Sequence, residues 1–83
     1  MYKLKIISQA QKDLNQLQGK IFYNIKSAIL ELAADPRPYG VTKLTNENGY
    51  RIRIGDYRAL YRIDDKLKEV FIYRIKHRKE AYR

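Results

Sequence analysis

Two runs of alternating apolar and polar residues, 49–54 and 57–64, flank the dipeptide Gly55-Asp56. Alternation with a period of two predicts β-strands, and the two-residue gap between the runs predicts a tight hairpin. Glycine at the first loop position suits a type II′ turn, whose backbone twist matches that of the strands. With this turn, residues whose numbers add to 111 face each other across the hairpin.

Three arginines then share one face of the hairpin. Arg53 lies opposite Arg58, and Arg51 lies two residues away along the same strand. Like charges placed opposite each other in a sheet are destabilising. A chain that keeps them there is expected to present them to an anion. In a small basic protein the commonest such anion is nucleic-acid phosphate.

The charge of the chain supports this interpretation. It has 18 basic and 9 acidic residues, which gives a net charge of +9. Residues 49–83 hold eleven basic and five acidic residues, whereas residues 1–48 hold seven and four, so the shorter segment carries more charge. Most of its cations are arginines, whose planar fork of donors suits phosphate. The alternative is that the charge serves solubility alone.

Length and composition predict the class of protein. The 83 residues are expected to form one domain, 1–83, with a single small core. The absence of cysteine excludes disulfides and thiolate metal sites and fits a reducing cytoplasm. No apolar run approaches the roughly 20 residues that span a membrane. The N-terminus lacks the apolar stretch of a signal peptide, so we expect a cytoplasmic protein without a membrane partner.

The remaining periodicities predict an α+β fold of order β-α-α-β-β-β, with a helical hairpin packed on a mainly antiparallel sheet. The expected elements are a strand at 2–7, a helix that begins with a Ser8–Gln11 capping box and stops at Gly19, a helix at 20–34 ended by Asp35-Pro36, a loop at 35–48, strands at 49–54, 57–64 and 68–76, and a charged tail at 77–83.

Alternation also assigns faces to the sheet. The face expected against the helices carries Tyr50, Ile52, Ile54, Tyr57, Ala59, Tyr61, Ile63, Val70 and Ile72. The opposite face carries Arg51, Arg53, Arg58, Leu60 and Arg62. A symmetric second hairpin places Arg62 opposite Glu69, a favourable pair, and Arg58 opposite Tyr73. Arg62 then has a partner within the fold, whereas the other three arginines have no evident one.

Aromatic and basic residues near these arginines favour RNA. Phosphates pair with cations, and unstacked bases lie on aromatic rings. Arg37 and Lys43 in the loop are expected to be solvated or to hold nucleic acid without specificity. The further candidates for RNA contact are Phe71 and Tyr73 on the last strand and Lys76, His77, Arg78, Lys79 and Tyr82 at its end.

RNA cleavage without a metal is chemically available to such a site. The 2′-hydroxyl attacks the adjacent phosphate, which requires a proton acceptor, a proton donor and cations around the phosphorane. Arginine supplies charge, but its very high pKa makes it a poor base. The base is then His77, Tyr82 or a group of the RNA. Asp64-Asp65 is the only acidic pair and is expected to form a turn, so we predict no metal site and no cofactor.

Two segments of the chain resemble the RelE/ParE toxin superfamily. Residues 49–61, GYRIRIGDYRALY, are similar to the central signature of that superfamily, and residues 77–82, HRKEAY, are similar to its tail. The preceding strand, the two helices and the Asp35-Pro36 loop also fit, so the resemblance covers nearly the whole chain. It implies the toxin of a type II toxin–antitoxin pair.

The resemblance further implies a ribosome-dependent, metal-independent endoribonuclease. RelE-like members cut mRNA in the ribosomal A site and leave a 2′,3′-cyclic phosphate and a 5′-hydroxyl. It implies that Arg51, Arg53 and Arg58 stabilise the reacting phosphate. It implies that Arg78 stabilises charge or assists the leaving group, and that Tyr82 takes part in stacking or activates the 2′-hydroxyl. His77 lies near the position of a histidine that some branches use.

This chain departs from the best-studied relative in two ways. That relative has lysines where this chain has Arg51 and Arg53, and an arginine, unlike a lysine, hardly loses a proton to act as a base. The spacing from Arg78 to Tyr82 is also shorter than in that relative.

ParE-like members share the fold but poison DNA gyrase. Gyrase inhibition without nuclease activity is therefore the alternative function, and passive RNA binding is a third. The implied partners are a cognate antitoxin, the ribosome with its mRNA, and DNA only through the antitoxin complex.

Overall fold

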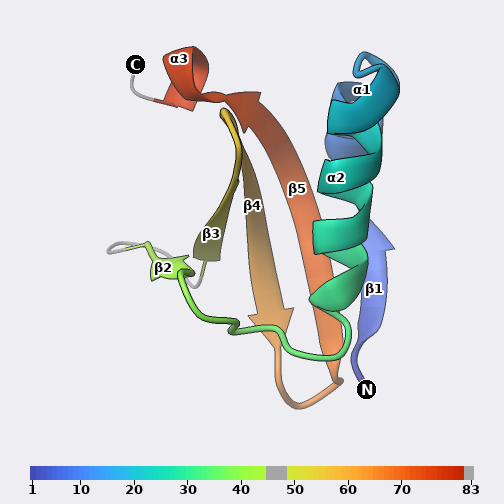
Figure 1. The fold of residues 1–83 in the computed structure, drawn as a ribbon. Coiled ribbons are helices and arrows are strands. Elements are labelled where there is room, and N and C mark those ends of the chain that lie inside the picture. The colour runs from blue at the N-terminus through green and yellow to red at the C-terminus, as the bar shows by residue number, and fades with distance from the viewer. Residues whose placement is uncertain (45–48, 82–83) are drawn as a thin grey trace.

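The computed structural model describes residues 1–44 and 49–81 and has two helices packed on one face of a five-stranded mixed sheet (Figure 1). The elements are β1 (Lys3–Ile6), α1 (Ser8–Asn15), α2 (Gly19–Glu31), β2 (Thr42–Lys43), β3 (Gly49–Ile54), β4 (Tyr57–Asp64), β5 (Glu69–His77) and α3 (Arg78–Ala81). The strand order is β1-β5-β4-β3-β2, with β1 parallel to β5 and the other pairs antiparallel. The predicted α+β fold is confirmed, and β2 is an addition within the region expected to be a loop.

The core lies between the helices and the sheet. Both helices contribute fully buried residues, including Leu14, Ile25 and Ile29. Every residue assigned to the helix-facing side of the sheet is buried in this core or packed against it. The other side of the sheet, here called the outer face, is not covered by α1 or α2 (Figure 1). No helix in the described part of the chain combines the length and apolar character needed to cross a bilayer.

The first hairpin has the predicted register. Arg53 pairs with Arg58, and the register holds from Ile54–Tyr57 to Gly49–Arg62. Gly55 has a φ of +60°, whereas Asp56 has a negative φ. This combination is that of a type II′ turn, in which only the first loop residue requires a positive φ.

The second hairpin differs from the prediction. Arg62 pairs with Phe71 rather than Glu69, and Arg58 pairs with Lys76 rather than Tyr73. Glu69 forms its ion pair with Lys5 of β1 instead, at 2.8 Å. Two features change the register: the strands first pair at Asp64 and Glu69, which moves the pairing of Arg62 from Glu69 to Phe71, and a bulge in β5 next to Leu60 and Tyr61 of β4 adds one more residue beyond that point.

The bulge inverts the alternation of side chains along the second half of β5. Tyr61 pairs with Ile72 and Leu60 pairs with Arg74, so Tyr73 is the extra residue. An extra residue shifts every later side chain to the other face of the sheet. Beyond the bulge, Ile75 therefore points into the core, where it is 4% exposed.

Asp13 of α1 holds the bulge in place. Its Oδ2 atom accepts hydrogen bonds from Arg74 Nε at 3.0 Å and from the backbone N–H of Ile75 at 2.8 Å. The parallel strand β1 ends before this point, since its last bond to β5 joins Ile7 N–H to the carbonyl of Ile72. A helix carboxylate therefore satisfies a strand donor that β1 does not reach.

The capping box predicted at Ser8 is wrong. Ile7 is the N-cap, and no side chain caps α1. Ile7 still bonds to β5 as an extended residue, so the helix begins at Ser8 and the Ser8 side chain is one position too late to cap it. Helix α2 ends at Glu31 rather than near residue 34, because Leu32, Ala33 and Ala34 donate to carbonyls three residues back.

Arg37 is not simply solvated; it anchors the loop after α2. Its guanidinium donates to both carboxylate oxygens of Asp65, at 3.2 and 2.8 Å, and its Nε donates to Tyr50 Oη at 3.1 Å. Tyr2 Oη also donates to Asp65, at 2.7 Å. The N-terminus, this loop and the β4–β5 turn are thus tied together at one end of the sheet.

Replacing Asp65 with asparagine should change how stability depends on pH. The hydrogen bonds from Arg37, and then from Tyr2, lower the pKa of Asp65 to about 2 from 3.8. A lowered folded-state pKa adds stability above the unfolded-state pKa, and this is lost as pH falls toward the folded-state value. Urea midpoints between pH 5 and 2 should therefore fall more steeply in the wild type than in Asp65→Asn. Parallel curves would contradict the ion pair.

Replacing Tyr61 with phenylalanine should destabilise the fold modestly. The buried hydroxyl of Tyr61 donates to the carbonyl of Pro36 at 2.7 Å, and burial raises its pKa. Without the hydroxyl, that carbonyl loses its donor, which costs about 1–2 kcal/mol of unfolding free energy. Urea denaturation measures the loss. The matched control is Tyr23→Phe on the exposed side of α2, and equal midpoints for the two variants would contradict the assignment.

Candidate nucleic-acid interface

Three cations form a row across the outer face near the β3–β4 turn. Arg53 of β3 pairs with Arg58 of β4, and Arg58 pairs with Lys76 of β5. The bulge in β5 creates this row, because uninterrupted alternation would turn Lys76 toward the helices. Arg58 on β4 thus has a like-charged residue beside it on each neighbouring strand, an arrangement that opposes folding. The row therefore has the arrangement expected of an anion-binding site.

Arg58 is buried, which was not expected of an arginine that the hairpin presents to an anion. Its exposed fraction is 6%, although it lies on the outer face. Arg58 occupies the central strand of the three, and α3 packs back against both β4 and β5. Burial fixes the position of a long side chain and lowers the local dielectric, which strengthens its attraction for an anion.

Arg53 and Arg51 are more accessible. Arg53 is exposed, and its Nε donates to the carbonyl of Gly55 at 3.1 Å, so its side chain folds back along the turn. Arg51 is half-buried and lies between Leu60 of β4 and Thr42 of β2. Both lie on the outer face, as predicted, and extend the positive charge along β3.

Helix α3 brings Arg78 to the same end of the sheet. The backbone N–H of Arg78 donates to the carbonyl of Asp56 at 2.7 Å, and its Nη1 lies 3.8 Å from Asp56 Oδ1. Both side chains are more than half exposed. An exposed ion pair of this length contributes little free energy, so an incoming anion can compete for Arg78.

His77 lies on the other face of the sheet. It pairs with Tyr57, whose ring it meets edge-on with centroids 5.1 Å apart, and it lines a cavity with Gln9 and Asp13 of α1. Its Nδ1 accepts the backbone N–H of Lys79 at 3.3 Å. The ring therefore packs beside the helical layer and supports the first turn of α3, away from the row of cations.

The other predicted RNA contacts are divided between the faces. Lys43 pairs with Tyr50 and so shares the helix-facing side, whereas Lys79 is exposed on α3. Tyr73 lies on the outer face, but farther from the turn than Lys76. Tyr82 lies outside the described residues. The structure thus brings together Arg51, Arg53, Arg58, Lys76 and Arg78, and separates them from His77 and Lys43.

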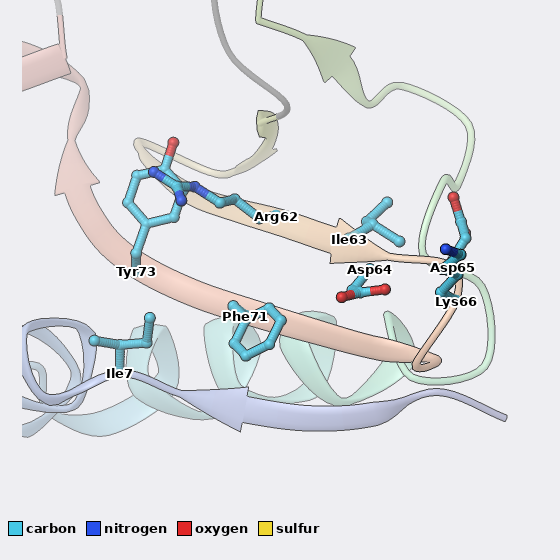
Figure 2. Close-up of a pocket in the computed structure, with 8 residues that line it drawn as sticks. All are labelled: Ile7, Arg62, Ile63, Asp64, Asp65, Lys66, Phe71 and Tyr73. Carbon is cyan, nitrogen blue, oxygen red and sulfur yellow. The ribbon is translucent and has the colours of Figure 1, made fainter.

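A groove of about 940 Å³ occupies the outer face at the opposite end of β4 and β5. Figure 2 shows Tyr73 and Arg62 together at one end of it, Phe71 in its middle part and Asp64 toward the β4–β5 turn. Sequence reasoning named Tyr73 and Phe71 but did not expect a groove. No set of three acidic or histidine side chains suited to a metal ion occurs among the described residues.

The missed bulge had a signal in the sequence. Buried residues in β4 keep a spacing of two, as at Ala59 and Tyr61. In β5 the spacing is two from Val70 to Ile72 but three from Ile72 to Ile75. A change from two to three within one strand indicates an inserted residue, and it would have assigned Lys76 to the outer face.

Comparison with known proteins identifies the family. The model of the ParE toxin of the type II toxin–antitoxin system parDE matches residues 4–82. The chain belongs to the RelE/ParE superfamily of type II toxins. It is 33% identical to toxin RelG of Mycobacterium tuberculosis, an alignment that covers 99% of this chain and 97% of that protein.

Solved structures of the superfamily have the same fold. The toxin in the RelBE2 complex of M. tuberculosis has a TM-score of 0.81 at 31% identity, covering 93% of this chain and 98% of that chain. The toxin in the archaeal RelE–RelB complex of Pyrococcus horikoshii has a TM-score of 0.83 at 31% identity, covering 93% and 94%. The superfamily resemblance drawn from residues 49–61 and 77–82 is confirmed.

Proposed function

We propose that this toxin is a ribosome-dependent mRNA endoribonuclease. The observation that carries the proposal is the row formed by Arg53, Arg58 and Lys76, with Arg78 beside it. Closely spaced cations on a rigid sheet suit a phosphodiester that gains negative charge during a reaction. Membership of the superfamily supports a toxin, and the row favours RNA as its target.

The chemistry assigned to the row is in-line attack by a 2′-hydroxyl. Its oxygen bonds to the adjacent phosphorus as its proton leaves, and the bond from phosphorus to the 5′-oxygen breaks as that oxygen gains a proton. The products are a 2′,3′-cyclic phosphate and a 5′-hydroxyl. Arg53, Arg58 and Lys76 stabilise the pentavalent phosphorane, and Arg78 stabilises charge on the leaving oxygen. Arg51 holds the neighbouring backbone.

The proton acceptor is assigned outside the row. His77 supports α3 from the opposite face, so its expected effect on cleavage is indirect. The tail tyrosine Tyr82 and groups of the RNA or ribosome remain the proposed acceptors. With the proton acceptor outside the row, the cations of the row stabilise negative charge and hold the RNA in position. Both effects make large contributions to phosphoryl transfer.

The net charge of +9 favours ribosomal RNA as the platform. Attraction of this kind depends on counterion release, so binding should weaken steeply as salt rises. Because ribosomes and translated mRNA are cytoplasmic, the proposed compartment of the toxin is the cytoplasm. The proposed place of cleavage is the ribosomal A site.

A cognate antitoxin is the proposed protein partner. The similar toxins of M. tuberculosis and P. horikoshii were solved in toxin–antitoxin and RelE–RelB complexes. For this chain we propose an antitoxin whose acidic residues cover the row of cations. DNA binding by the complex would come from the antitoxin.

Mapping the 5′ ends of cellular mRNA after tightly controlled expression tests the proposal. We expect codon-phased cuts within translated regions and none in untranslated RNA. Intact mRNA together with an SOS response would indicate gyrase inhibition, the alternative that the match to the ParE model favours. Intact mRNA without an SOS response would indicate passive RNA binding, and either result would overturn the nuclease assignment.

A further inference from the structure

We propose that the groove on the outer face binds a nucleobase of the same RNA, with Phe71 as the stacking surface and Asp64 as the acceptor for an amino group of the base. The inference rests on the proposed function, because it places a second part of that substrate. It adds a base-reading site to a site that otherwise contacts only phosphate.

The groove continues the row of cations along the sheet. Arg58 in the row and Arg62 in the groove both lie on β4 and both face outward. Four residues of strand separate them, which is about 13 Å. A single strand of RNA held by the row can therefore pass over the groove within a few nucleotides, with no change of face.

Aromatic rings with neighbouring cations form the floor of the groove. Phe71 is half-buried, and Lys5 Nζ lies 5.6 Å from its ring centroid. Arg62 lies over the ring of Tyr73 at 5.4 Å. A ring for the base and a cation for the adjacent phosphate are the two components of a single-strand binding surface.

Tyr73, which lines the groove, lies close to Gly49 of β3. Tyr73 reaches across β4 so that its hydroxyl would lie 3.1 Å from a Cβ atom at Gly49, and Leu44 would lie 3.2 Å from it. A Cβ atom at Gly49 would therefore require Tyr73 or Leu44 to shift by a few tenths of an ångström. Glycine at this position leaves Tyr73 where it lies beside the groove.

Asp64 supplies selectivity. Its Oδ1 accepts the backbone N–H of Leu67 at 3.0 Å, which fixes the carboxylate, and within the described part of the chain no donor reaches its Oδ2. The neighbouring Asp65 is already bonded to Arg37. A fixed carboxylate can accept a hydrogen bond from the exocyclic amino group of cytosine or adenine. The one donor on the Watson–Crick edge of uracil, N3–H, lies between two carbonyl oxygens that repel a carboxylate, so uracil is disfavoured.

The chemistry of the groove favours a base over a protein segment. Asp64 and Asp65 balance Arg62 and Lys66, so the groove carries no net charge of its own, and the RNA phosphates are attracted mainly by the row beside it. A carboxylate beside a stacking ring matches a planar, amino-bearing ligand, whereas an apolar helix would leave that carboxylate desolvated. Because the groove lies beside the row, the phosphates of an RNA whose base enters the groove can contact the cations of the row.

Titration of the full-length ¹⁵N-labelled toxin with 2′-O-methyl hexamers of cytidine and of uridine tests the proposal. These probes cannot be cleaved by 2′-hydroxyl attack, so their binding does not depend on nuclease activity. We expect the cytidine hexamer to shift the amide signals of both the row and the groove, and to bind about tenfold more tightly than the uridine hexamer. Phe71→Ala should weaken cytidine binding by about tenfold.

Two further variants complete the design. Asp64→Asn should reduce the preference for cytidine while the turn at Leu67 is kept, because an amide oxygen can still accept that N–H. Tyr23→Ala, which removes an exposed aromatic ring from α2 on the other side of the protein, should bind both hexamers as the wild type does.

Several results would overturn the proposal. These are an unchanged affinity in Phe71→Ala, shifts confined to the row, equal affinity for the two hexamers, or no binding at all. If Phe71→Ala kept its RNA affinity but lost affinity for the antitoxin, the groove would belong to a protein partner instead. A toxin that bound the cytidine hexamer in the groove yet cut no mRNA would support the base site and refute the nuclease assignment.

Discussion

Replacing Arg58 with methionine is expected to lower the rate of RNA cleavage by about 10²- to 10³-fold. Arg58 lies at the centre of the row, between Arg53 and Lys76, and burial holds its guanidinium in one place. Methionine keeps most of the stem but removes the charge and the donors. Cleavage of mRNA on programmed ribosomes by purified toxin measures the effect.

Arg58→Lys is the matched variant. It keeps a positive charge but loses the planar fork of donors, so we expect an intermediate rate. Circular dichroism and urea midpoints serve as controls, since the loss of rate must exceed any loss of folded protein. A folded Arg58→Met toxin that cleaves at the wild-type rate would show that the buried guanidinium does not contact the reacting phosphate.

Replacing Asp13 with alanine is expected to lower the free energy of unfolding by about 2 kcal/mol. The substitution removes the acceptor of three hydrogen bonds: an exposed one from Gln9 Nε2, and those from Arg74 Nε and from the backbone N–H of Ile75. It leaves a strand donor without a partner beside the bulge. Because the bulge sets the face of Lys76, we also expect a loss of cleavage of about tenfold in the protein that remains folded.

Asn15→Ala is the control for this experiment. Asn15 lies on the same helix and accepts only an exposed bond from Gln11 among the contacts described for its side chain. We expect its stability and rate to remain close to those of the wild type. If Asp13→Ala matched Asn15→Ala in both measurements, the bulge would not depend on the carboxylate.

The first hairpin could be predicted from local rules. A two-residue loop that begins with glycine fixes the register of the strands on both sides, so the pairing of Arg53 with Arg58 follows from the sequence alone. The helix-facing residues follow for the same reason, because alternation in β3 and β4 is unbroken. Long periodic segments such as α2 are equally well determined by burial of one face.

Features that depend on distant contacts could not be predicted in the same way. The register of the second half of β5 depends on the bulge, which Asp13 holds from a helix about sixty residues earlier in the chain. Arg37 is anchored by Asp65, and nothing in the loop sequence indicates that partner. The capping box at Ser8 failed because the pairing of Ile7 with β5 decides where the helix begins.

The candidate site was therefore predicted in part. Arg51, Arg53 and Arg58 were assigned to the correct face, since they lie on strands whose register the turn sets. The burial of Arg58 was missed, because it depends on neighbours in β5 and α3 rather than on the hairpin. The position of His77 away from the row depends on the same bulge as that of Lys76.

A comparison of Lys76→Ala with Lys43→Ala tests the central claim most directly. Both variants remove one lysine from the sheet, but Lys76 lies in the row on the outer face and Lys43 lies on the face shared with Tyr50. We expect Lys76→Ala to cut ribosome-bound mRNA at least about tenfold more slowly than the wild type, and Lys43→Ala to cut within about twofold of it. Equal losses in the two variants, or a larger loss in Lys43→Ala, would contradict a phosphate site on the outer face.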